Sequence, residues 1–162
     1  MMHLAQAQIP PHPPVAYYNA QCARCHGPGG SFYGPTLGKG KNDAQLREVI
    51  RQMCEGQGGM PLQGIDLEAQ LAYHRAIIRR EPFVCVTLIK PGRLAGEVYD
   101  AKSITLQVGS KRFAGRISGD GFSVIVPKGL DARGGTITAI GSKGSKSVLP
   151  VKAIFGSRNP LR

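Results

Sequence analysis

Two cysteines and a histidine form the part of this sequence best suited to chemistry. They lie in the stretch Cys22-Ala23-Arg24-Cys25-His26, which has the pattern C-x-x-C-H. Thiols at this spacing can each form a thioether with a vinyl group of haem, and the adjacent imidazole can then ligate the iron. A redox dithiol belongs in a βαβ context, and a zinc site needs a second ligand pair at matching spacing; neither pattern is present. The motif therefore predicts one covalently attached haem c.

Helices must carry this motif and enclose the haem. Residues 16–23 contain two tyrosines and no helix breaker, so they predict a short helix that presents the cysteines and His26. Apolar residues at helical spacing predict a second helix over residues 44–52, with Asn42 or Asp43 as its N-cap. The same pattern predicts a third helix over residues 66–80.

Residues 18 to about 78 resemble a small class I cytochrome c. The shared motifs are an aromatic residue four positions before C-x-x-C-H-G, then G-P-x-L, G-G-M-P, and a last helix that contains L-A-Y; they include Tyr18, Pro35, Leu37, Met60 and Tyr73. The resemblance implies that Met60 is the second axial ligand, opposite His26, and that Leu37 belongs to the haem-binding residues. It also implies that the Pro35 carbonyl accepts the Nδ1 proton of His26, and that Tyr18 and Tyr73 join the first and last helices.

Two other residues compete with Met60 for the sixth position on the iron. Met53 lies inside the second predicted helix, where a packing role is the ordinary one. His74 lies on the third predicted helix, where we expect a solvated or capped side chain rather than a ligand. With His26 and Met60 both bound, the iron has no open position, which predicts an electron-transfer protein rather than an enzyme. A haem peroxidase or ligand sensor, the minor alternative, would require Met60 to leave the iron.

The second half of the chain has the pattern of an all-β domain. Apolar runs separated by turn residues predict about seven strands, at residues 83–89, 94–99, 104–108, 111–117, 122–126, 136–140 and 148–155. Strands at this spacing predict a β-sandwich. The stretch from Gly119 to Ala139 resembles the Ig-like modules of bacterial surface proteins. The chain is thus expected to comprise an extended arm (1–14), a small all-α cytochrome c domain (15–80) and an Ig-like sandwich (81–162).

The net charge of +11 is concentrated in the β half. Residues 1–80 hold 8 Lys/Arg against 5 Asp/Glu, a net of +3, whereas residues 81–162 hold 13 against 5, a net of +8. This surface suits an acidic redox partner, or peripheral contact with an anionic membrane. Nucleic acid is not expected, because the chain has no basic helix and no aromatic stacking motif. The alternative function is a haem-bearing relay subunit of a larger respiratory or photosynthetic complex, anchored by the β domain.

Covalent haem attachment normally takes place outside the cytoplasm, so we expect a periplasmic or otherwise exported protein. Ala5-Gln6-Ala7 has the form of a cleavage site, and the preceding residues suggest a leader that was trimmed or replaced. No apolar run approaches the length of a membrane span. In an oxidising compartment, the remaining Cys54 and Cys85 predict a disulfide between the two domains. His3 and His12 lie in the N-terminal arm and are not expected to be ligands.

Overall fold

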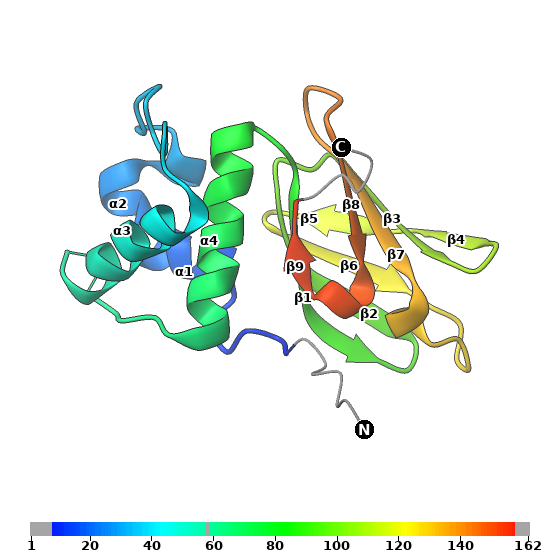
Figure 1. Ribbon diagram of the computed structural model, residues 1–162. Coiled ribbons are helices and arrows are strands. Elements are labelled where there is room, and N and C mark those ends of the chain that lie inside the picture. Colours follow the sequence, from blue (N-terminus) through cyan, green and yellow to red (C-terminus); the bar gives the residue numbers. More distant parts are fainter. Residues whose placement is uncertain (1–7, 58, 158–162) are drawn as a thin grey trace.

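The computed structural model describes residues 8–57 and 59–157, which divide into helices and strands (Figure 1). The helices are α1 (Pro14–Gln21), α2 (Ala23–His26), α3 (Asp43–Glu55) and α4 (Gly64–Arg79), with 3-10 helices η1 (Pro28–Gly30), η2 (Ala132–Gly134) and η3 (Val151–Ala153). The strands are β1 (Phe83–Lys90), β2 (Arg93–Tyr99), β3 (Ser103–Val108), β4 (Lys111–Ala114), β5 (Arg116–Ser118), β6 (Gly121–Ile125), β7 (Thr136–Ile140), β8 (Lys146–Pro150) and β9 (Phe155–Gly156). This order confirms the predicted fold class, all-α followed by all-β.

The first predicted helix is two helices that meet at Cys22. Proline at the first position starts α1, because its missing N–H would have no helical partner there in any case. The chain then re-forms a turn as α2 over Ala23–His26, and Gly27 ends it with a φ of 76°. The C-x-x-C-H motif therefore lies on a helical turn whose end is fixed by a glycine.

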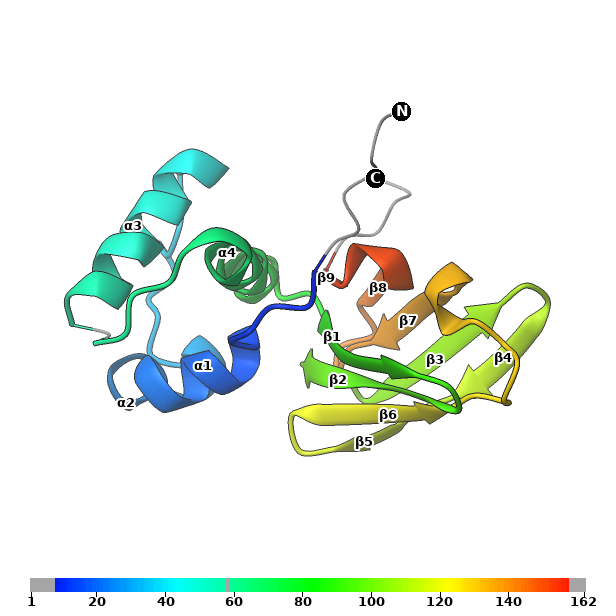
Figure 2. The same cartoon turned by 90° about the horizontal axis from the view of Figure 1, so that it is seen from below.

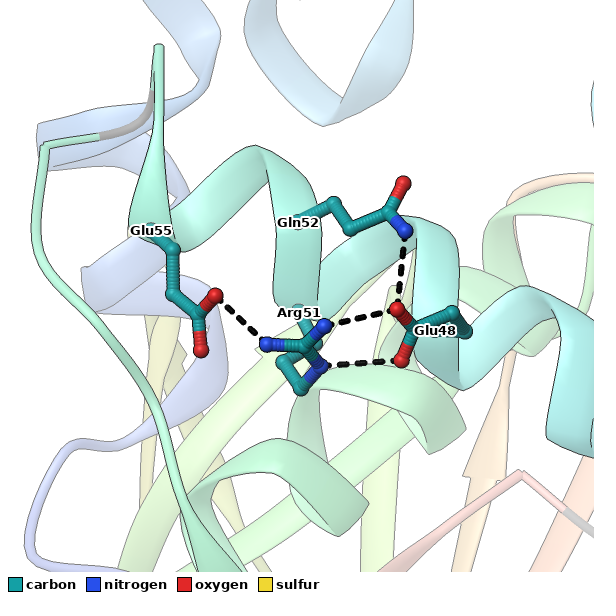
Figure 3. A network of polar contacts seen from close by, with 4 residues as sticks. All are labelled: Glu48, Arg51, Gln52 and Glu55. Atoms are coloured by element: carbon teal, nitrogen blue, oxygen red, sulfur yellow. Dashed lines mark hydrogen bonds and ion pairs between the residues drawn. The ribbon is translucent and has the colours of Figure 1, made fainter.

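Side-chain contacts at both ends explain why α3 is longer than predicted. Its N-terminus is a capping box, in which the Asn42 side chain accepts the Gln45 N–H while the Gln45 side chain accepts the Asn42 N–H. At the other end, Arg51 donates to both Glu48 and Glu55 (Figure 3), which supports the helix beyond residue 52. The Arg51 guanidinium lowers the pKa of Glu48 to about 2.

The β half is a sandwich of two antiparallel sheets (Figure 2). One sheet has five strands in the order β5-β6-β2-β1-β9, and the other has four in the order β4-β3-β7-β8. Leu106, Val124 and Ile137, all fully buried, lie in the core between them. The alternation predicted for residues 104–108 and 122–126 places these side chains inward.

Two of the predicted strands each cross from one sheet to the other. The segment 111–117 is divided at Gly115, where an added Cβ would lie 2.3 Å from the Ile104 side chain. The segment 148–155 is divided by η3 and by Ile154, whose φ is 68°. Both bends end one strand and start another, while the apolar pattern of the sequence continues across them. The described residues therefore contain nine strands where seven were predicted.

The helices and the sandwich share a hydrophobic cluster, which we call the joint core. It contains Val15, Tyr18, Tyr73, Ala76, Phe83 and Cys85, from α1, α4 and β1. The Tyr73 ring meets that of Tyr18 edge-on at a centroid distance of 5.5 Å and that of Phe83 at 5.2 Å. The predicted contact between the first and last helices is thus confirmed, and α4 also lies against the sandwich (Figures 1 and 2).

Strand β2 makes polar contacts with both ends of the segment that carries the cysteines. The Glu97 carboxylate accepts the N–H groups of Val15 (2.9 Å) and Ala16 (2.8 Å) at the start of α1. Desolvation raises the pKa of Glu97, while these two hydrogen bonds act in the opposite direction. After the motif, the Tyr99 hydroxyl donates to the Gly29 carbonyl at 3.3 Å. The sandwich therefore supports the segment on either side of C-x-x-C-H.

The described part of the N-terminal arm is tied to α4. The His12 N–H and its ring Nδ1 reach the two carboxylate oxygens of Asp66, at 2.9 and 2.7 Å. His3 lies outside the described residues. Within the described residues, no helix has the length and apolar character needed to cross a membrane.

Candidate haem site

Both cysteines of the motif and His26 border one cavity of about 310 Å³. Its wall is mostly apolar and comes chiefly from α3 and the loop before it; these residues are Leu37, Leu46, Val49, Ile50, Met53 and Cys54. Gln70 and His74 of α4 add polar groups to the wall, as do Gln21 and Gln57. The donor set and the apolar wall, to which Leu37 belongs, fit covalently held haem.

The two thiols differ in exposure. Cys22 is half-buried between the joint core and a second cluster, which we call the helical core and which contains Tyr17, Leu46, Ile50, Cys54, Leu62, Leu67 and Leu71. Cys25 is exposed. Burial raises the pKa of Cys22 to about 11, so this thiol is protonated at neutral pH. Both groups reach the cavity from one helical turn, as the spacing of the motif requires.

The imidazole of His26 lies against an aromatic ring, while its hydrogen bond to Pro35 stays a prediction. Pro35 is exposed, and no hydrogen bond joins its carbonyl to His26 within the described part of the chain. The side chain that packs on the imidazole is Tyr33, whose ring centroid lies 4.7 Å from that of His26. Tyr33 was not singled out from the sequence, where it is one aromatic residue in a loop rich in glycine.

The two methionines lie in different places. Met53 borders the cavity from α3 and is 40% exposed. Met60 packs against the helical core, and the Tyr17 hydroxyl donates to its backbone carbonyl at 2.6 Å. Among the described residues, the side chains that border the cavity do not include Met60. Its assignment as the sixth ligand stays a prediction.

His74 is buried in the cavity wall, which corrects the expectation of a solvated or capped side chain. It is 6% exposed, and Gln70, one helical turn earlier, is 1% exposed. The His74 ring contacts the Tyr33 hydroxyl at 3.0 Å and the Gln70 carbonyl at 2.9 Å. Burial lowers the pKa of His74 to about 4, so the ring is neutral at pH 7. Gln70 and His74, two polar residues one turn apart on the amphipathic helix α4, were the signal in the sequence.

Acidification is expected to destabilise the protein through His74. An unfolded histidine binds a proton near pH 6.5, whereas His74 in the fold does so only near pH 4. Between these values the unfolded state binds more protons, so the free energy of unfolding falls as the pH falls, by at most about 3 kcal/mol. Urea unfolding at several pH values should show the free energy of unfolding falling with pH in the native chain, and falling less in His74→Leu. Equal slopes in the two proteins would contradict the expectation.

The predicted disulfide between Cys54 and Cys85 is not formed in the structure. Cys54 packs in the helical core beside Tyr17, while Cys85 lies in the joint core on β1. Both thiols are free and buried. The sequence prediction rested on counting cysteines, and packing places the two residues in separate clusters.

Residues 10–72 match the family model described as cytochrome C oxidase, cbb3-type, subunit III. The matched segment contains the cavity residues from Gln21 to Gln70 and ends before His74. The match supports a mono-haem cytochrome c domain in the helical half, and thereby a haem-bearing electron-transfer protein. It does not extend into the β-sandwich. No curated protein matches the chain.

Proposed function

We propose that this chain is a c-type cytochrome that carries one haem on Cys22, Cys25 and His26 and transfers single electrons between protein partners. The observation that carries the proposal is the meeting of both thiols and the imidazole at one apolar cavity, inside the segment that matches a cytochrome family. Each thiol would add across one vinyl group, and His26 would ligate the iron. When bound, haem supplies a one-electron ferric/ferrous couple.

We infer that Met60 is the sixth ligand. Its place in G-G-M-P matches the cytochrome c pattern, and the hydrogen bond from Tyr17 holds its backbone beside the helical core. Both ring nitrogens of His74 already have partners, which disfavours His74 as a ligand. Thioether ligation raises the reduction potential relative to a second imidazole, because sulfur stabilises ferrous iron. The Pro35 carbonyl remains our prediction for the acceptor of the His26 Nδ1 proton.

Replacing Met60 with alanine is expected to abolish the far-red sulfur-to-iron charge-transfer band of the ferric protein and to lower its reduction potential. Met53→Ala is the matched control, since it removes the methionine that borders the cavity from α3. That variant should keep the band. Loss of the band in Met53→Ala, with persistence in Met60→Ala, would assign Met53 as the ligand instead.

The second candidate function is a haem-bearing subunit of a larger complex. The family description favours it, because it names a subunit of an oxidase. The two functions differ in the state of the native protein: a relay subunit should purify with a stoichiometric partner, and a shuttle should purify as a free monomer.

We propose that the sandwich is a docking module and that the protein is exported. The β half carries a net charge of +8, which suits an acidic redox partner or an anionic membrane surface in contact with the periphery of the protein. Covalent haem attachment supports a location outside the cytoplasm. Binding of the protein to an acidic partner protein or to anionic vesicles that weakens steeply with added salt would support electrostatic docking.

A further inference from the structure

The cavity wall contains a polar cluster that ligation of haem by Cys22, Cys25 and His26 does not require. Gln70 and His74 are both more than nine-tenths buried, and the Gln70 Oε1 atom has no hydrogen-bond partner within the described residues. Buried polar side chains are costly unless they are paired, so their presence in an apolar wall calls for a role.

The contacts of His74 determine which of its nitrogens carries the proton. Its Nδ1 lies 2.9 Å from the Gln70 carbonyl oxygen, which can only accept a hydrogen bond. Nδ1 therefore carries the proton of the neutral ring. The other nitrogen, Nε2, has a free lone pair and accepts from the Tyr33 hydroxyl at 3.0 Å. Tyr33 is thus held through its hydroxyl by a residue of α4.

The ring of Tyr33 lies against the imidazole of His26. The two centroids are 4.7 Å apart and the planes are inclined by 32°, a tilted arrangement at a separation typical of aromatic pairs. The backbone makes room for this ring at Gly30, whose φ is +73° and where an added Cβ would lie 2.4 Å from the Tyr33 side chain. The Tyr33 ring therefore occupies the space that Gly30 leaves open, and its hydroxyl is held by His74.

We propose that Tyr33, anchored to His74, is a positioning residue that sets the orientation of the His26 imidazole. The inference rests on the proposed function, because it concerns the imidazole that would ligate the iron. A group that packs on a ligand and fixes its plane tunes the metal without touching it. The rotation of the imidazole plane about the bond to iron determines how unpaired spin is distributed over the haem.

The test compares the haem-methyl proton resonances and the reduction potential of the ferric holoprotein with those of variants. Tyr33→Leu removes the packed ring and is expected to shift both. Tyr33→Phe keeps the ring and removes only its anchor, so a smaller shift of the resonances is expected. Phe32→Leu is the matched control, because Phe32 is the aromatic residue directly before Tyr33 and is 72% exposed. It should leave both readouts unchanged.

The link to His74 is tested by a double-variant cycle. If Tyr33→Phe and His74→Leu break the same contact, the double variant should shift the resonances no more than the larger single change. Removing both partners also leaves no unpaired buried group from that contact. The double variant should therefore fold even if one of the single variants is destabilised. Additive shifts would overturn the anchoring role of His74.

The outcomes separate this inference from the proposed function. A native protein without covalent haem by mass measurement would contradict the proposed function and the inference together. If the native protein carries covalent haem and Tyr33→Leu has the same haem-methyl resonances and reduction potential as the native protein, the positioning role alone is overturned. Met60→Ala would remove the residue proposed as the sixth ligand, and its far-red band gives a readout independent of Tyr33.

Discussion

Replacing both Cys22 and Cys25 with alanine is expected to abolish covalent haem attachment. The two thiols lie on one helical turn at the edge of the cavity, and each would supply one thioether bond. Without them, any haem bound by His26 would be held only by coordination and packing. Mass spectrometry under denaturing conditions should show the mass of the bare chain for the double variant and the added mass of one haem for the native protein.

Cys54→Ala is the control for that experiment. Cys54 borders the same cavity but lies on α3, outside the motif. This variant should keep its covalent haem, because the missing thiol has no place in the attachment spacing. Covalent haem in the Cys22/Cys25 double variant, or its loss in Cys54→Ala, would show that the attachment residues are wrongly assigned.

Tyr73→Ala is expected to lower the free energy of unfolding by about 3–5 kcal/mol, the cost of truncating a large aromatic side chain in a core. Tyr73 is 1% exposed and packs on Tyr18, Phe83 and Tyr99, so its ring contacts both the helices and the sandwich. Because the joint core belongs to both the helical half and the sandwich, the loss of stability should affect the unfolding of both. Urea unfolding followed by haem absorbance and by far-ultraviolet circular dichroism should show both transitions at a lower midpoint.

Phe32→Ala provides the matched aromatic truncation at an exposed position. Its side chain is 72% exposed, so the change should alter the free energy of unfolding by no more than about 0.5 kcal/mol. A Tyr73→Ala protein in which only the haem signal moves would indicate that the sandwich unfolds independently, contrary to a shared core.

The fold class followed from the sequence because local patterns were strong. Apolar residues at helical spacing marked α3 and α4, and apolar residues at alternate positions marked β3 and β6. The two strand segments that change sheets escaped prediction, because Gly115 and Ile154 redirect the backbone while the apolar pattern continues. A pattern of period two identifies inward-facing residues but not the sheet that each strand joins.

The site was predictable where a motif fixes chemistry and spacing together, as in Cys22, Cys25 and His26. Residues that depend on tertiary packing were not. His74 could be judged only by its type and position until the structure placed it in the cavity wall beside Tyr33. The same limit explains why the predicted disulfide is not formed in the structure. Counting cysteines carries no information on which cluster buries Cys54 and which buries Cys85.

With haem bound as proposed, the contacts of β2 with Val15, Ala16 and Gly29 would affect how fast electrons leave the haem. Electron tunnelling rates fall steeply with distance. In a carrier whose docking domain moves relative to the haem, transfer is therefore limited by how often the partner comes close to the haem. Here β2 of the sandwich, which we propose as the docking module, is hydrogen-bonded on both sides of the motif to the segment that would carry the haem. A partner seated on the sandwich would therefore meet the haem at one set separation, and the rate would depend on where the partner binds rather than on any motion of a hinge.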